Sequence, residues 1–191
     1  MRSYKVTDPA STYVLTTSEV KEHLKIDSSV EDTYIDSLII AAQNSCEEYT
    51  NRFFIDTTLN QYCDTWEDAK ELLKNHVRSV TEITYYDSDN SLQTLATSVY
   101  TYDSALMPTR IALKPSQSFP AIVDKINAVI VEYDVGAASA SAVDNAIKQA
   151  VLLTIGNWYQ NRAAVIVGRQ VNALPMSAKY LLDQYRVQVV R

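Results

Sequence analysis

The sequence predicts an α+β fold, in which helices from both ends of the chain form a core and a small, mostly antiparallel β-sheet is inserted between them. Apolar positions three and four residues apart, typical of helices, run through 30–54 and return after residue 142. Residues 57–136 instead alternate polar and apolar positions and are rich in Thr, Val, Ile and Tyr. With 191 residues, 47% hydrophobic and 21% charged, the chain can bury a sizeable core as one domain.

We therefore expect a single domain over residues 1–191. Its parts are an N-terminal arm at 1–14, a helical core at 16–54 and 142–190, and a β-rich insertion at 57–136.

The first helix of the core is short. Thr16 and Glu19 have the spacing of a capping box, so the helix begins at residue 16 or 17. Leu15 and Val20 have the spacing of a hydrophobic staple, which fixes the direction of chain entry. A polar turn follows, and the next helix should therefore return antiparallel to the first.

The second helix is the clearest amphipathic segment of the chain. Ser28 and Glu31 again have the capping-box spacing and predict its start. Its apolar side comprises Ile35, Leu38, Ile39, Ala42, Cys46 and Tyr49. An apolar side of this length requires a covering element.

Short strands are expected through the middle of the chain. Their ranges are 57–66, 77–86, 92–95, 99–102, 110–113 and 128–135. Residues 86–91 form a cluster of turn-forming residues between the second and third of these strands.

The helical period returns at Ala142 or Val143. One face of this long helix carries Ile147, Ala150, Val151, Thr154, Trp158 and Arg162, and it is the expected cover for the second helix. Asp144 lies in the first turn, where the helix dipole favours a carboxylate. Residues 163–171 are expected to be a packed loop or strand. Pro175 introduces a last helix with Tyr180, Leu181 and Tyr185 on one side.

Composition argues against several functional classes. Gly136, Gly156 and Gly168 are the only glycines and lie far apart, so no phosphate-binding glycine loop can form. The net charge of -6 and the lack of a basic run disfavour binding to nucleic acid. Cys46 and Cys63 have no metal-ligand spacing. The first residues lack the continuous apolar core of a signal peptide, and no apolar run approaches about 20 residues, so we expect a soluble chain in a reducing cytoplasm.

The candidate catalytic groups do not form a recognisable motif. His23 and His76 lack a nucleophile motif, although a triad needs only spatial adjacency. Asp87-x-Asp89 resembles the start of a calcium loop but lacks its glycine and its final glutamate, so a hairpin turn is expected. We expect no catalytic residue, no metal site and no cofactor.

Aromatic and basic residues near the C-terminus form the candidate interface. They are Trp158, Arg162, Tyr180, Leu181, Leu182, Tyr185, Arg186 and Arg191. The chain also holds thirteen tyrosines, which serve either an interface or the margin of a small core.

Several of these segments, in this order, resemble the head-tail connector (adaptor) family of long-tailed bacteriophages. The matching stretches are LTTSEVKEHLKID at 15–27, D-x5-LI-x-AA at 32–42, YTNR at 49–52, V-x-x-AI-x-QA at 143–150, WY-x-x-R at 158–162, LP at 174–175 and LL-x-x-YR at 181–186. The middle sheet resembles only the longer members, and Asn90 stands where the family pattern has a turn glycine.

The resemblance implies a non-enzymatic ring of about twelve copies. Such a ring docks beneath the portal of a filled head, extends the DNA channel and presents a platform for the next neck protein. It also implies that the chain is in the virion neck, and in the host cytoplasm during assembly, and that residues 180–191 reach the portal. DNA would pass through the channel without specific binding. The alternatives are another neck or tail-completion protein or, from other classes, a small hydrolase or a DNA-binding regulator.

Overall fold

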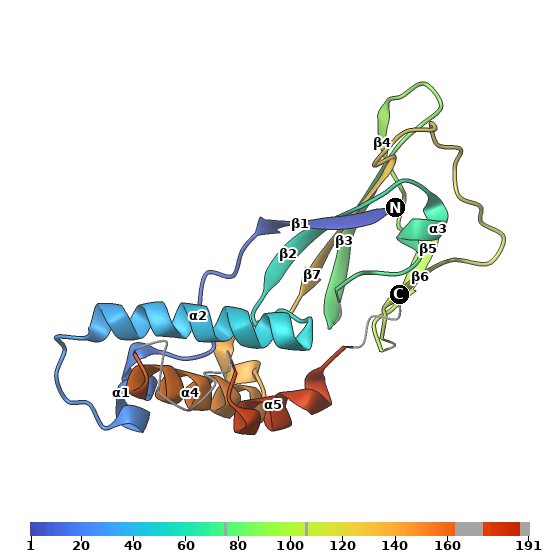
Figure 1. The fold of residues 1–191 in the computed structure, drawn as a ribbon. Helices are drawn as coiled ribbons and strands as arrows, with labels where there is room; N and C mark the ends of the chain where they lie inside the picture. Colours follow the sequence, from blue (N-terminus) through green and yellow to red (C-terminus); the bar gives the residue numbers. More distant parts are fainter. Residues whose placement is uncertain (75, 106, 163–173, 188–191) are drawn as a thin grey trace. The chain divides into compact units, whose positions relative to one another are not determined.

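The computed structural model describes residues 1–74, 76–105, 107–162 and 174–187 of the chain. These residues form two compact units (Figure 1). The sheet unit comprises Met1–Ala10 and Asp56–Gly136, and the helical unit comprises Ser11–Ile55 and Ala137–Arg191. The mixture of helices with an antiparallel sheet confirms the α+β class.

Five strands of the sheet unit form one antiparallel sheet in the order β1-β2-β7-β3-β4. Their bounds are β1 Arg2–Asp8, β2 Thr57–Cys63, β3 Val77–Tyr86, β4 Leu92–Thr94 and β7 Val129–Val135. A separate antiparallel pair is formed by β5, Tyr100–Asp103, and β6, Arg110–Leu113, and the short helix α3 spans Trp66–Ala69. The six predicted strands are therefore present, with small shifts at their ends.

Residues 1–14 differ from the expectation of an arm. Arg2–Asp8 pair with β2 and form the edge strand β1. Most of these side chains are exposed, so apolar burial does not reveal the strand in the sequence. A strand of this kind is stabilised by backbone hydrogen bonds to its neighbour, and that neighbour lies about fifty residues further along the chain.

The core of the sheet unit lies on one face of the sheet. Strands β2 and β7 each alternate strictly between buried and half-buried residues, as expected for strands with one covered face. The buried positions include Leu59, Val131 and Tyr133, each fully inaccessible to solvent. Outside these two strands, Leu72, Leu95, Tyr100 and Ile111 are also buried.

The described residues of the helical unit form four α-helices: α1 Thr17–Leu24, α2 Asp32–Thr50, α4 Asn145–Gln160 and α5 Met176–Leu182. Two 3-10 turns, Ala140–Ala142 and Asp183–Tyr185, precede α4 and follow α5. Helix α4 packs against α2, which confirms that the later helix covers the second, and α1 and α5 pack against both (Figure 1).

The two predicted capping boxes have different outcomes. Thr16 caps α1 as predicted: its hydroxyl oxygen accepts from the Glu19 N–H at 3.3 Å, and its own N–H donates to the Glu19 carboxylate at 2.7 Å. The box predicted at Ser28 and Glu31 is wrong. Helix α2 has no side-chain cap, and the Ser28 hydroxyl oxygen instead accepts from the Val30 N–H at 3.3 Å.

Helix α5 has one buried side and one exposed side. Ala178 and Leu182 face the core, whereas Tyr180 is 82% exposed and Leu181 is half-buried. The side predicted to carry Tyr180, Leu181 and Tyr185 is therefore exposed at Tyr180 and half-buried at Leu181 and Tyr185. The expected packing of residues 163–171 lies outside the described residues.

Candidate functional site

Three of the predicted interface residues, Arg162, Tyr185 and Arg186, take part in two side-chain clusters of the helical unit, one near each end of α2. The first cluster contains Glu31, Tyr34, Tyr159 and Arg162. The Arg162 guanidinium lies 2.6 Å from the Glu31 carboxylate and within 5 Å of two ring centroids, 4.8 Å for Tyr34 and 4.6 Å for Tyr159. The Tyr159 hydroxyl donates to the same carboxylate.

Electrostatics in this first cluster favours the charged forms of Glu31 and Arg162. The hydrogen bond from Tyr159, followed by the one from Arg162, lowers the pKa of Glu31. The hydrogen bond to Glu31 raises the pKa of Arg162. An arginine held over aromatic faces beside a carboxylate is an ordered surface group, so Arg162 is already committed to contacts within its own chain.

The second cluster joins the C-terminal end of α2 to the segment after α5. The Tyr49 hydroxyl donates to Asp183 at 2.6 Å, and the Arg186 guanidinium lies 5.1 Å from the Tyr49 ring centroid. Arg52 lies 5.7 Å from the ring centroid of Tyr185. The hydrogen bond to Asp183 raises the pKa of Tyr49, because it stabilises the protonated phenol.

Backbone contacts extend this second cluster. The Val187 N–H donates to the Thr50 carbonyl at 3.0 Å, so the chain after α5 is held along the end of α2. Burial, and then a hydrogen bond with Asp144, raises the pKa of Tyr185. The segment leading to the C-terminus is thus fixed by Tyr49, Arg52 and Thr50.

Of the eight predicted residues, seven lie in the described part of the chain and Arg191 lies outside it. Tyr180 and Arg186 are exposed, and Arg162 is exposed but paired. Trp158, Leu181 and Tyr185 are half-buried. The structure corrects the place of Leu182, which is fully buried and packs in the helical core, because its position on α5 faces the same side as Ala178.

Sequence reasoning missed Met176 and a hollow on the same unit. Met176 is 81% exposed and lies one helical turn before Tyr180. Between α1 and α4 is an open hollow of about 390 Å³, lined by Leu15, Glu19, Glu22, His23, Asn145, Lys148, Gln149 and Leu152. The hydrophobic-staple spacing pointed to Leu15 and the amphipathic period of α4 could have suggested Leu152, but the hollow arises only from the packing of the two helices.

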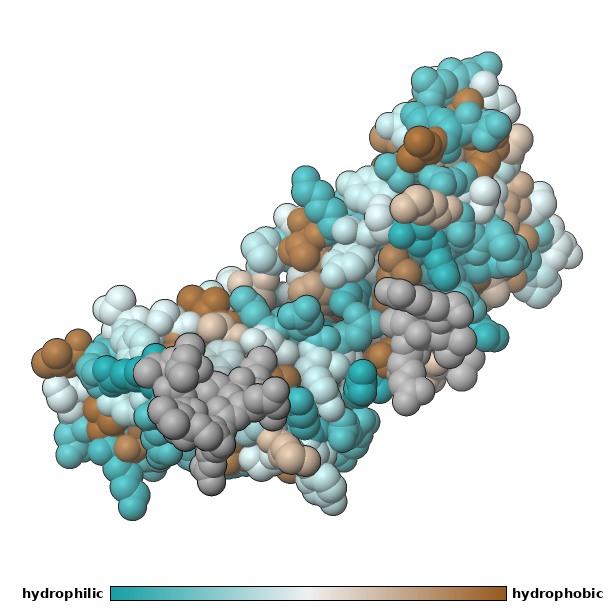
Figure 2. All heavy atoms as spheres, in the orientation of Figure 1, coloured by the Kyte–Doolittle hydropathy of each residue, from teal (hydrophilic) through white to brown (hydrophobic). Residues whose placement is uncertain are grey.

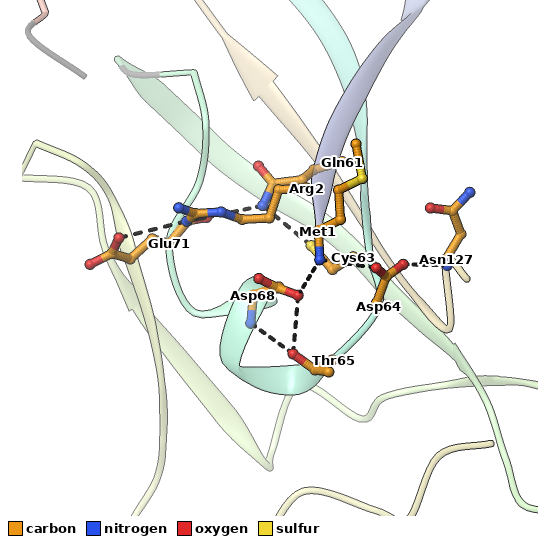
Figure 3. A network of polar contacts seen from close by, with 9 residues as sticks. All are labelled: Met1, Arg2, Gln61, Cys63, Asp64, Thr65, Asp68, Glu71 and Asn127. Atoms are coloured by element: carbon orange, nitrogen blue, oxygen red, sulfur yellow. Dashed lines mark hydrogen bonds and ion pairs between the residues drawn. The ribbon is translucent and has the colours of Figure 1, made fainter. Parts of the chain in front are cut away.

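A polar network in the sheet unit orders the start of β1 and the loop after α3 (Figure 3). The amino group of Met1 lies 2.9 Å from carboxylate oxygens of both Asp64 and Asp68. Gln61 is fully buried; its amide donates to the Glu71 carbonyl at 3.0 Å and its side-chain oxygen accepts from the Leu73 N–H at 2.7 Å. These groups satisfy one another, which is typical of a structural network.

The candidate calcium loop at Asp87 has a structural role. Asp87 accepts from the N–H groups of Ser91 and Asp89 at 2.9 and 3.0 Å, which confirms the turn. The hydrogen bond from Ser91, followed by the one from the Gln93 amide, lowers the pKa of Asp87. Among the described residues, no group of three or more His, Cys, Asp or Glu side chains could hold a metal ion. Within the same residues, no helix is both long and apolar enough to span a membrane.

Exposed apolar side chains are scattered over the visible surface. On the face shown in Figure 2, hydrophobic residues occupy separate small areas among hydrophilic ones. Single exposed apolar residues of this kind are common in soluble proteins. Pairs on one helix face, such as Met176 and Tyr180, are therefore the more informative feature.

The fold defined by the two units is shared with chains of a phage-like particle. A chain in a structure described as the virion of native gene transfer agent (GTA) particle matches with a TM-score of 0.78 and 20% identity, covering 98% of this chain and 97% of that chain. Chains from structures described as the neck of empty GTA particle computed with C6 symmetry and the neck of native GTA particle computed with C12 symmetry give TM-scores of 0.72 and 0.68. Their identities are 20% and 19%, and each match covers 100% of this chain and 97% of the other.

The sequence itself defines the family. The model of the head completion protein family matches residues 13–188, and the chain belongs to this family. This confirms the resemblance to proteins of the head-tail connection. A search of curated proteins found no match.

Proposed function

We propose that this chain is a structural head-tail connector of a long-tailed phage or a phage-like particle. Several copies form a ring beneath the portal, extend the DNA channel and present a platform for the next neck protein. The observation that carries the proposal is the head completion family match over residues 13–188. The full-length likeness to chains in neck structures with C6 and C12 symmetry supports a cyclic ring.

The two units form one connector domain in this proposal, and the role is structural rather than enzymatic. An acidic chain, with a net charge of -6, suits a channel through which DNA must slide, because like charges prevent tight binding to phosphates. The ring belongs to the virion neck and assembles in the host cytoplasm.

The end of the C-terminal segment is the portal-docking part. Arg186 is exposed, Leu181 and Tyr185 are half-buried, and Arg191 follows them in the sequence. Arg186 is exposed and is held over Tyr49, so its guanidinium is presented in a defined direction. Trp158 and Arg162 lie near the other end of α2 and make a second, smaller contribution.

The test is the mass of the assembly by light scattering, measured on the protein alone and with assembled portal of the same phage. We expect a ring of about a dozen copies, alone or on the portal. Reversing two charges, Arg186→Glu with Arg191→Glu, should abolish portal binding and leave the circular dichroism spectrum unchanged. Lys5→Glu with Lys114→Glu is the matched control, because it makes the same charge change within the sheet unit.

Two results would contradict this proposal. A chain that stays monomeric and ignores the portal at all concentrations is not a connector. A ring that forms but binds a tail-side component and never the portal would favour the alternative, another neck or tail-completion protein.

A further inference from the structure

The outer face of α5 carries an unusual pair of apolar side chains. Met176 and Tyr180 are 81% and 82% exposed and lie four residues apart, so they are neighbours on one side of the helix. Ala178 and Leu182, on the opposite side, are fully buried. The pair is therefore directed away from the helical core. Two large anchors at this spacing are typical of a helix that inserts into a groove of a partner.

The hollow between α1 and α4 fits such a pair in size and polarity. Its volume of about 390 Å³ lies in the range of pockets that accept several side chains or a small molecule. Leu15 and Leu152 supply apolar surface, and Glu19 and Glu22 contribute carboxylates from α1.

Charge supports the same pairing. Between Met176 and Leu182, α5 carries Lys179 and no acidic residue. The lining of the hollow carries two carboxylates, Glu19 and Glu22, against the single lysine Lys148. A helix with one positive charge beside its apolar anchors is complementary to a hollow with an excess of negative charge.

The symmetry of a ring identifies the occupant as a second copy of this chain. A cyclic ring needs two different surfaces on each copy, one that inserts and one that receives. The outer face of α5 and the α1–α4 hollow are two such surfaces, and both belong to the helical unit. Chains of the same fold occur in neck structures with C6 and C12 symmetry.

We propose that Met176 and Tyr180 of one copy insert into the α1–α4 hollow of the next copy and that this contact closes the ring. The proposal rests on the proposed function, and it assigns Tyr180 to the contact between copies rather than to the portal. Lys179 of the inserting copy lies against Glu19 and Glu22 of the receiving copy.

Disulfide cross-linking of the full chain tests the contact directly. A protein carrying Tyr180→Cys and Glu22→Cys should, under oxidation, give a ladder of covalent multimers on a non-reducing gel. A matched protein with Tyr180→Cys and Ser37→Cys, which places the second thiol on the exposed side of α2, should give no ladder. The native Cys46 and Cys63 are fully buried and do not interfere.

Substitution of the anchors gives a second readout. Met176→Ser with Tyr180→Ser should raise the concentration at which half of the chains assemble by about tenfold or more, as expected when interface anchors are lost. Glu22→Lys should weaken assembly, and adding Lys179→Glu to it should restore part of the loss.

The outcomes separate this inference from the proposed function. One outcome is that light scattering shows a ring while the protein with Tyr180→Cys and Glu22→Cys gives no ladder of covalent multimers. In that case the ring closes through another surface, so the inference is wrong and the connector proposal stands. If the serine variant forms a normal ring and loses only portal binding, Tyr180 belongs to the portal contact instead. A chain that never assembles, even on the portal, overturns both.

Discussion

Polar side chains in this protein mostly serve one of two purposes. They either satisfy backbone hydrogen-bonding groups next to a core, or they hold a segment that is distant in the sequence. Gln61 is an example of the first purpose, because its amide satisfies backbone groups of the loop at Glu71 and Leu73. Glu31 is an example of the second, because it binds Tyr159 and Arg162, more than a hundred residues away. The role of a polar residue in this chain therefore follows from the groups with which it forms hydrogen bonds or ion pairs.

Cys46 gives a prediction at this residue scale. Burial raises the pKa of its thiol to about 11, and the thiol lies 3.9 Å from the Thr154 hydroxyl. In the unfolded chain the pKa of a cysteine is about 8.5. Above that pH the unfolded state loses its proton first and binds fewer protons than the folded state, so the free energy of unfolding falls as pH rises toward 11.

The measurement is urea denaturation at several pH values between 7 and 10.5. We expect the wild type to lose stability more steeply than Cys46→Ala, by up to about 1.4 kcal/mol per pH unit. Asn44→Ala, on the exposed side of the same helix, should leave the slope unchanged. Equal slopes for wild type and Cys46→Ala would show that the thiol is not buried in the folded protein.

At the scale of elements, α1 begins at a capping box and packs closely against α4. Glu19 completes the capping box of α1, and the Thr16 N–H, followed by the Thr16 hydroxyl, lowers the pKa of its carboxyl. Gly156 lies inside α4 facing α1. A Cβ added there would lie 3.6 Å from His23 Nε2 and 3.8 Å from Leu24 Cδ2, which are ordinary van der Waals distances.

Gly156→Ala should therefore stabilise the protein. Alanine loses less conformational entropy than glycine in a helix interior, so we expect the free energy of unfolding to rise by about 0.5–1 kcal/mol, measured by urea denaturation. Gly136→Ala is the contrasting control: Gly136 has a φ of 84°, where a Cβ is strained, so a loss of about 1 kcal/mol or more is expected. Destabilisation by Gly156→Ala would mean that α1 packs closer to α4 than the structure shows.

At the scale of the whole molecule, each unit has a hydrophobic core of its own. The helical unit buries Ile35, Ala42, Val151 and Ile155, and the sheet unit buries Leu59, Val131 and Ile83. The chain leaves and re-enters the helical unit at one place, since Ile55 forms a bridge with Ala137 and the Ala137 N–H donates to the Phe54 carbonyl at 2.9 Å.

This arrangement predicts that the sheet insertion can be removed. A protein that starts at Ser11 and joins Ile55 to Ala137 through a short Gly-Ser linker should fold into a helical unit with a cooperative urea transition and a helical circular dichroism spectrum. The intact chain is the reference. A product without cooperative unfolding would show that the two units fold as the single domain expected from the sequence.

Local signals predicted much of the fold. Strand β3 and strand β6 have the predicted bounds, Val77–Tyr86 and Arg110–Leu113, because alternation and β-branched residues are visible in the sequence. The capping box at Thr16 was also correct, since all of its atoms lie within four residues. The apolar side of α2 was predicted for the same reason, with Ile35, Leu38, Ile39, Ala42 and Cys46 all buried.

Long-range contacts account for the errors. The box at Ser28 failed because the Glu31 carboxylate binds Tyr159 and Arg162 and not its own helix start. Strand β1 was missed because its exposed side chains carry no apolar period and its partner β2 is distant in the sequence.

By itself, then, the sequence determined the class, the family and the order of the elements other than β1 and the short helix α3, because caps, periods and family motifs depend on residues close together in the chain. The tertiary structure alone decided which partners the polar groups bind within the chain. It also decided that Leu182 is buried while Met176 and Tyr180 are exposed, and that a hollow lies between α1 and α4. These features depend on which helix faces pack together. Packing of that kind is set by the combined burial of distant segments, which no local pattern records.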